Sequence, residues 1–125
     1  MEAFAACPFC STEGAMVSNA LAYARYDINP VSRGHLLIIP RRHVADWFEI
    51  SADERQAIFS LADEARARLL AELAPDGFNL GINVGRVAGQ TVFHAHLHLI
   101  PRYQGDVEDP RGGVRGVIPE KQHSS

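Results

Sequence analysis

The clearest repeat of apolar positions lies between residues 51 and 73. Ser51 and Glu54 have the spacing of a helix capping box, and a Pro-Asp-Gly run at 75–77 interrupts the pattern that follows them. Between these limits, apolar side chains recur every three or four residues, which is the repeat of one helix face. They are Ile58, Ala62, Ala65, Leu69 and Leu73, widened by Phe59 and Leu70. The pattern predicts an amphipathic helix over about 51–73.

Shorter apolar runs on both sides of this helix predict strands. A short helical turn is expected over 43–49, and a glycine-bounded loop over 84–89. Strands gathered around one long helix, without regular alternation of the two, favour an α+β fold with an antiparallel sheet of about five strands. The strands are expected at 15–26 (one or two), at 36–39 up to Pro40, at 78–83 and at 91–100.

The composition fits one globular domain. The chain has 125 residues, of which 46% are hydrophobic and 22% charged. We therefore expect a single domain over 1–125, with a core over about 1–103 and a tail over 104–125. No apolar run approaches the roughly 20 residues that span a bilayer. The net charge of −3 argues against nucleic acid as a partner, and the N-terminus lacks a secretory pattern, which favours a cytoplasmic protein.

Three histidines alternate with apolar residues in the last predicted strand. On a strand, His94, His96 and His98 would share one face at a spacing of roughly 6–7 Å. Such a row is costly as mere structure, because every ring nitrogen needs a partner. A metal site and nucleophilic catalysis by a neutral imidazole are both open interpretations. The opposite face, expected to pack on the core, would carry Phe93, Ala95, Leu97 and Leu99.

Residues just upstream of this row carry hydrogen-bond donors. Asn83 and Gln90 have uncharged amide groups, and the glycine-rich loop between them can present backbone N–H groups. Donors that converge on imidazoles suit a phosphoryl group better than a bare cation, so this region favours phosphate chemistry.

Cys7 and Cys10 form a Cys-Pro-Phe-Cys motif. A pair with this spacing can be a redox couple, half of a metal site or a coincidence. A structural disulfide is not expected in a reducing compartment. The Ser-Thr-Glu-Gly run that follows predicts a turn rather than the long helix of a thioredoxin-like motif. Half of a metal site is the favoured interpretation.

The segment Gly-Gln-Thr-Val-Phe-His-Ala-His-Leu-His-Leu-Ile-Pro-Arg at 89–102 resembles the defining motif of the histidine triad superfamily. Gly34 and His35, followed by Leu-Leu-Ile-Ile-Pro, resemble the second signature of that family. The likeness runs from about Cys7 to Arg102. The continuation after it is similar to a bacterial branch near the diadenosine polyphosphate hydrolases.

This resemblance implies a phosphohydrolase that cleaves a nucleotide at its α-phosphate, with a dinucleoside polyphosphate, a nucleoside phosphoramidate or an aminoacyl-adenylate as substrate. His96 would be the nucleophile and form a nucleotidyl-histidine intermediate. Asp27 would accept the ribose hydroxyls, and His35 would support the triad from the neighbouring strand. The α-phosphate oxygens would be held by His98, Asn83 and Gln90 and by backbone amides near Thr91 and Val92.

The resemblance also implies a metal and a partner. Some branches of the superfamily bind zinc through a cysteine pair, a histidine after the Gly-His strand and the first triad histidine. Two thiolates and two imidazoles make a closed, structural Zn²⁺ site. Family members are usually homodimers, and we expect the subunit contact around Phe59 and Leu70. The corresponding zinc ligands here are Cys7, Cys10, His43 and His94.

Two other functions are open at this point. A nucleotidyl transferase or phosphorylase would pass the intermediate to phosphate rather than to water. A zinc-stabilised nucleotide-binding module would not turn over at all. His98 favours hydrolysis, because a glutamine at its position would favour transfer, and the intact triad disfavours the module. The leaving group is left open among a nucleotide, an amine, an aminoacyl group and a sulfate.

Overall fold

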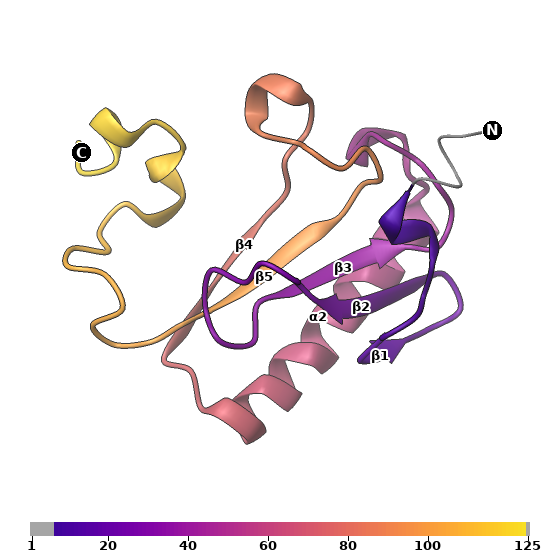
Figure 1. Cartoon of the computed structure of the whole chain (residues 1–125), viewed down its shortest axis with the longest axis horizontal. Coiled ribbons are helices and arrows are strands. Elements are labelled where there is room, and N and C mark those ends of the chain that lie inside the picture. The colour runs from indigo at the N-terminus through magenta and orange to yellow at the C-terminus, as the bar shows by residue number, and fades with distance from the viewer. Residues whose placement is uncertain (1–6, 125) are drawn as a thin grey trace.

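The computed structural model describes residues 7–124, which form a five-stranded antiparallel sheet with one long helix across one face (Figure 1). The strand order is β1-β2-β3-β5-β4, and every neighbouring pair is antiparallel. This is the α+β architecture that the sequence predicts. The strands are β1 (Val17–Ser18), β2 (Ala22–Tyr26), β3 (Leu36–Pro40), β4 (Gly77–Gly81) and β5 (Leu97–Arg102).

The long helix α2 (Ala52–Leu73) begins and ends where the sequence predicts. The Ser51 hydroxyl accepts the backbone N–H of Glu54, and the Glu54 carboxylate accepts the N–H of Ser51, which completes the capping box. Ala74 ends the helix in the left-handed conformation, at φ 50°. The helix buries one stripe against the sheet, made of Ile58, Leu61, Ala62, Ala65 and Leu69. Within residues 7–124, no helix is both long and apolar enough to cross a membrane.

The central strand β3 is buried on both faces. Leu36 and Ile38 join the core beneath α2, whereas Leu37 and Ile39 face the opposite side of the sheet. There they pack with Phe9, which lies in a 3₁₀ turn at Pro8–Cys10. The N-terminal segment therefore covers part of the face that α2 leaves open.

The prediction of a strand over 91–100 is wrong in its first half. Strand β5 begins only at Leu97, and the chain before it is irregular. The N–H of Ala95 donates to the carbonyl of Val44 at 2.7 Å, so this segment pairs with the loop after β3 rather than with the sheet. His94, His96 and His98 therefore do not form one row on a strand face. Phe93, expected in the core, is 42% exposed.

Two smaller boundaries also differ. Strand β4 spans Gly77–Gly81 rather than 78–83. The helical turn expected over 43–49 is a 3₁₀ turn at Trp47–Glu49, where the Asp46 side chain accepts the N–H of Phe48 at 2.8 Å. Trp47 packs in the core while Phe48 is exposed, because three residues of 3₁₀ helix bury only one side.

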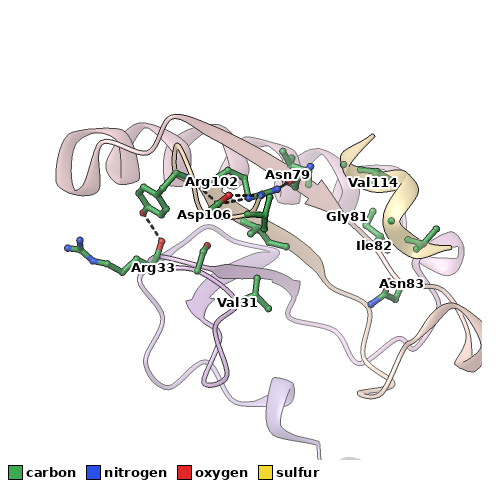
Figure 2. Close-up of a pocket in the computed structure, with 17 residues that line it drawn as sticks. Val31, Arg33, Asn79, Gly81, Ile82, Asn83, Arg102, Asp106 and Val114 are labelled. Atoms are coloured by element: carbon green, nitrogen blue, oxygen red, sulfur yellow. Dashed lines mark hydrogen bonds and ion pairs between the residues drawn. The ribbon is translucent and has the colours of Figure 1, made fainter. Parts of the chain in front are cut away.

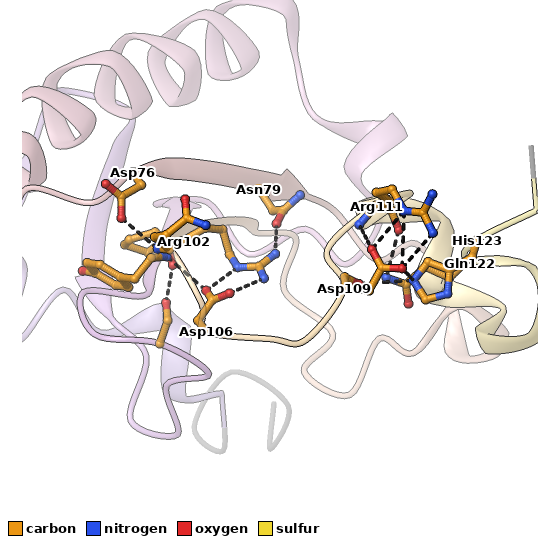
Figure 3. A network of polar contacts seen from close by, with 12 residues as sticks. Asp76, Asn79, Arg102, Asp106, Asp109, Arg111, Gln122 and His123 are labelled. Carbon is orange, nitrogen blue, oxygen red and sulfur yellow. Dashed lines mark hydrogen bonds and ion pairs between the residues drawn. The ribbon is translucent and has the colours of Figure 1, made fainter.

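The chain after β5 lies beside β4, on the side of the molecule away from β1 and β2 (Figure 1). The Arg102 guanidinium anchors this segment through the Asp106 carboxylate and the Asn79 side-chain oxygen, at 2.7–2.8 Å (Figure 3). Further along, Asp109 accepts hydrogen bonds from Arg111. Two short 3₁₀ turns follow, at Gly113–Val117 and Pro119–Lys121.

Candidate active site

A cavity of about 330 Å³ opens on the sheet face that α2 does not cover. Strand register explains its floor: Arg25 on β2 is opposite Leu37 on β3, and Leu37 is opposite His98 on β5. Cross-strand partners point to the same face, so these three side chains lie side by side. Six of the predicted site residues line this cavity: Asp27, Asn83, Thr91, Val92, His96 and His98.

His96 is buried at the cavity wall and has a fixed tautomer. Its Nδ1 lies 2.8 Å from the carbonyl oxygen of His94. A carbonyl only accepts, so Nδ1 carries the proton and Nε2 keeps a lone pair. Burial lowers the pKa of His96, and the hydrogen bond to His94 and the charge of Asp27 only partly oppose this. The ring is therefore neutral at pH 7, with Nε2 as a nucleophilic nitrogen.

His98 has the opposite tautomer, because a chain of hydrogen bonds ends on it. The N–H of Val31 donates to Nδ1 of His35 at 3.1 Å, which leaves the His35 proton on Nε2. That Nε2 lies 3.0 Å from Nδ1 of His98 and donates to it. The remaining nitrogen of His98, Nε2, therefore carries a proton. Burial, followed by the neighbouring His96 and His35, lowers the pKa of His98 to about 4.

Asp27 connects the same group to the loop after β2. One carboxylate oxygen accepts the N–H of Asn29 at 2.9 Å, and the other lies 3.6 Å from Nε2 of His35. Asp27, His35 and His98 are close enough to suggest a second metal site. The His35 tautomer argues against it, since the nitrogen that faces the other two residues is a donor. Hydrogen bonding accounts for this cluster.

Gln90 does not line the cavity, contrary to the expectation that its amide holds a phosphate. It is 4% exposed, and its side chain is fully engaged with backbone groups. The amide oxygen accepts the N–H of Gly85, and the amide nitrogen donates to the carbonyls of Ala45 and Val92. Gln90 therefore shapes the loop that carries Thr91 and Val92.

The four predicted zinc ligands lie together. Their ligand atoms are all within 4.8 Å of one another, although Cys7 and His94 are 87 positions apart in the sequence. The His94 Nε2–H donates to the carbonyl of Pro40 at 2.7 Å, so its Nδ1 lone pair faces Sγ of Cys7 at 3.4 Å. Nδ1 of His43 lies 3.2 Å from Sγ of Cys10. Two thiols and two imidazoles in this arrangement form a donor set that could hold a metal ion.

His94 links this cluster to the cavity. Its ring belongs to the Cys₂His₂ group, while its carbonyl oxygen accepts the proton on Nδ1 of His96. The same residue thus faces the Cys₂His₂ cluster with its side chain and orients the neighbouring imidazole with its backbone.

A larger cavity of about 750 Å³ adjoins the first, between strands β4 and β5 and the C-terminal segment (Figure 2). Ile82, Ile100 and Val114 contribute to a mainly apolar lining. The charge of Arg102 at its edge is offset by Asp106. Asn83 lines both cavities and stands at their junction.

Phe9 and Arg25 are among the residues of the smaller cavity that sequence reasoning missed. The Phe9 ring packs edge-on against His96, with ring centroids 5.0 Å apart. Arg25 lies two positions before Asp27 and lines the same cavity. Alternation along strand β2 would have indicated Arg25, because residues two apart share a face. Nothing local in the sequence indicates where Phe9 packs.

Comparisons with known proteins agree with this geometry. Residues 11–105 match the model of the HIT domain. A HIT family protein from Bacillus anthracis has a structure with a TM-score of 0.76 and 35% identity, over 92% of this chain and 88% of that one. A Zn-bound histidine triad family protein from Mycobacterium smegmatis has a TM-score of 0.74 and 29% identity, over 94% and 93%.

The name of a third relative states an enzyme activity. The bifunctional bis(5'-adenosyl)-triphosphatase/adenylylsulfatase FHIT of Arabidopsis thaliana is 35% identical over 88 residues, which are 70% of this chain and 49% of that protein. The match to the HIT domain model extends over most of the chain and includes all three alternating histidines. The chain belongs to the histidine triad family of nucleotide-binding proteins.

Proposed function

We propose that the protein is a nucleotide hydrolase that forms a nucleotidyl-histidine on His96. The observation that carries this proposal is that His96 and His98 line the smaller cavity in opposite tautomers. Nε2 of His96 offers a lone pair, and Nε2 of His98 offers a proton. Their rings are 5.0 Å apart, centroid to centroid. A nucleophile beside a hydrogen-bond donor suits attack on a phosphorus atom whose oxygens gain negative charge.

The reaction has two displacements. In the first, Nε2 of His96 forms a bond to the α-phosphorus, and the bond to the leaving group breaks with its electron pair on the leaving atom. The imidazole becomes cationic, and the His94 carbonyl stabilises the proton that stays on Nδ1. In the second, water attacks the phosphorus, releases a proton, and returns the electron pair of the P–N bond to Nε2. Each displacement inverts phosphorus, so the product retains its configuration.

The cavity supports roles for the remaining residues. The His98 Nε2–H, the Asn83 amide and the backbone near Thr91 and Val92 hold the phosphate oxygens. Asp27 accepts the ribose hydroxyls. His35 keeps the His98 proton on the nitrogen that faces the substrate, because it occupies the other nitrogen with its own N–H.

The leaving group extends past Asn83 into the larger cavity. A lining that is mainly apolar and a volume of about 750 Å³ support a bulky leaving group such as a second nucleotide. The adenosyl-triphosphatase and adenylylsulfatase activities in the name of the FHIT relative support an acid anhydride as the bond that breaks.

Cys7, Cys10, His43 and His94 hold a structural Zn²⁺ in this proposal. The donor chemistry of the cluster and the Zn-bound relative from Mycobacterium smegmatis support it. A zinc ion held by these four residues would tie the N-terminal segment to His94, and it would supply stability rather than a chemical step. The chain's own contribution to orienting His96 is the His94 carbonyl.

The protein is also proposed to be a homodimer. Strand β4 is an edge of the sheet, and edge strands are normally covered or paired. Phe59 and Leu70 on α2, the predicted subunit contact, are 46% and 37% exposed, which supports this face as part of the interface. Light scattering should give about twice the 13.7 kDa of one chain, and a mass of one chain at micromolar concentration would contradict the dimer.

The decisive experiment traps the intermediate. The protein is mixed with a dinucleoside polyphosphate labelled at the α-phosphate and quenched in alkali, and the labelled residue is mapped. Label on His96 supports the proposal, and label elsewhere or inversion at a chiral phosphorus contradicts it. Product analysis with and without inorganic phosphate separates the hydrolase from the transferase, since only a transferase forms nucleoside diphosphate from the phosphate. A protein that binds nucleotide and gives neither product is a binding module.

A further inference from the structure

One cation in the smaller cavity has no part in the reaction described above. Arg25 projects from β2 on the same face as His98, two strands away across Leu37. Its Nη1 donates to the carbonyl of Pro8 at 3.2 Å, and its guanidinium carbon lies 5.7 Å from the centre of the Phe9 ring. Within residues 7–124 it forms no ion pair with a carboxylate.

The position of Arg25 places it at the nucleoside end of the cavity, an assignment that rests on the proposed function. The phosphate lies at His96 and His98, and the larger cavity beyond Asn83 lies on the β4 side. The nucleoside must therefore extend the other way, toward β2. The walls there are Phe9, Arg25, Ile28 and Leu37, which combine flat or apolar surfaces with one cationic donor group.

We propose that Arg25 reads the edge of the base and that the cavity selects guanine over adenine. A guanidinium has donors in a planar fork and no acceptor. Guanine presents two acceptors, O6 and N7, on one edge, whereas adenine presents the acceptor N7 beside the N6 amine, which is a donor. Adenine would therefore place a donor against a donor. One of the five N–H groups of Arg25 donates to Pro8, and the guanidinium also interacts with the Tyr23 hydroxyl, so part of the fork keeps donors for the base.

A purely positioning role is the alternative. Arg25 also fastens the segment that carries Cys7 and Cys10, through Pro8 and Phe9. That role predicts a loss of bound metal or of thermal stability when Arg25 is replaced. It also predicts that every nucleotide binds more weakly by the same factor. Base reading predicts a change in the ratio of affinities, so the two roles give different results.

The experiment is equilibrium binding of nucleoside monophosphates to the full chain by calorimetry. GMP should bind about 5- to 150-fold more tightly than AMP, the range that one bidentate base contact gives. IMP keeps O6 and N7 and should bind like GMP, whereas 7-deaza-GMP should lose most of the preference. In Arg25→Met the GMP:AMP ratio should fall to about one, and in Arg25→Lys it should be intermediate, because an ammonium lacks the planar fork.

Arg68→Met is the matched control, since Arg68 lies on α2 and donates to the Met16 carbonyl at 3.5 Å. The GMP:AMP affinity ratio of Arg68→Met should equal that of the wild type. Equal affinities of GMP and AMP for the wild type, or an unchanged ratio in Arg25→Met, would overturn the inference and leave the proposed function intact. IMP binding like AMP would assign the preference to the guanine N2 amine and overturn it as well. Failure of every nucleotide to bind would overturn the proposed function itself. If Arg25→Met does not fold, the wild-type series with IMP and 7-deaza-GMP still decides the question.

Discussion

Acid should destabilise this fold in a way that depends on His98. The His98 ring is half-buried and held neutral, with a pKa lowered to about 4 from the ordinary 6.5. In the unfolded chain the ring regains the ordinary value. Well above pH 6.5 neither state binds the proton, so His98 adds no pH dependence there. Between pH 6.5 and 4 only the unfolded chain is protonated, and stability must fall as the pH falls.

The magnitude follows from the two pKa values. At pH 5, a site with a pKa of 6.5 in the unfolded state and about 4 in the folded state lowers the free energy of unfolding by about 2 kcal/mol at most. Solvent reaches part of the His98 ring and screens its electrostatic interactions, which reduces this contribution to the free energy of unfolding. We expect about 1 kcal/mol from His98 between pH 7.5 and pH 5.

The His98 contribution to the unfolding free energy can be isolated by urea unfolding over pH 4 to 8. The wild type and His98→Asn are compared in one buffer series. Both proteins lose stability in acid through His35, His94 and His96, whose pKa values burial also lowers. Only the wild type loses the His98 contribution, so its unfolding free energy should fall by about 1 kcal/mol more than that of the variant. If the unfolding free energies of the two proteins fall in parallel with pH, burial does not hold His98 neutral and the reasoning is refuted.

Three further outcomes are expected. His96→Asn should keep nucleotide binding and lose turnover by about four to six orders of magnitude, the scale of losing a catalytic nucleophile, measured by single-turnover kinetics; turnover near the wild-type rate would exclude the covalent role. Cys7→Ser should lose about one zinc per chain by elemental analysis and melt at a lower temperature, because metal binding is coupled to folding. Gly34→Ala should cost about 2–5 kcal/mol, since Gly34 has φ +86° and a Cβ there would lie 2.8 Å from Cδ1 of Leu73. Gly14→Ala, at φ +79° with no neighbour within 4 Å, is its control and should cost only about 1–2 kcal/mol in urea unfolding.

The sequence alone determines the long helix. Helix α2 has its limits in local features, a capping box at Ser51 and Glu54 and a Pro-Asp-Gly run after residue 74. Its apolar repeat predicts which face is buried, because side-chain direction in a helix depends only on spacing. The alternation in β5 likewise predicts that Leu97 and Leu99 face the core, and both are buried.

Tertiary structure decides the course of the chain just before β5. A run of alternating residues predicts a strand wherever it occurs, but a strand forms only where a neighbouring strand supplies hydrogen-bond partners. Strand β3 is paired with β5 only from Leu36 to Ile38, so its partners end at Leu97. Beyond that point Ala95 bonds to the loop at Val44, and His94 turns toward the cysteines.

Tertiary structure also decides which polar residues are available to a substrate. Asn83 and Gln90 look alike in the sequence, as amides at the two ends of a glycine-rich loop. Gln90 is occupied by three backbone groups and lies outside the cavity, whereas Asn83 lines it. Arg25 and Phe9 come to the same cavity from distant segments. Such contacts between residues far apart in the chain depend on how strands and loops meet, and no local pattern specifies them.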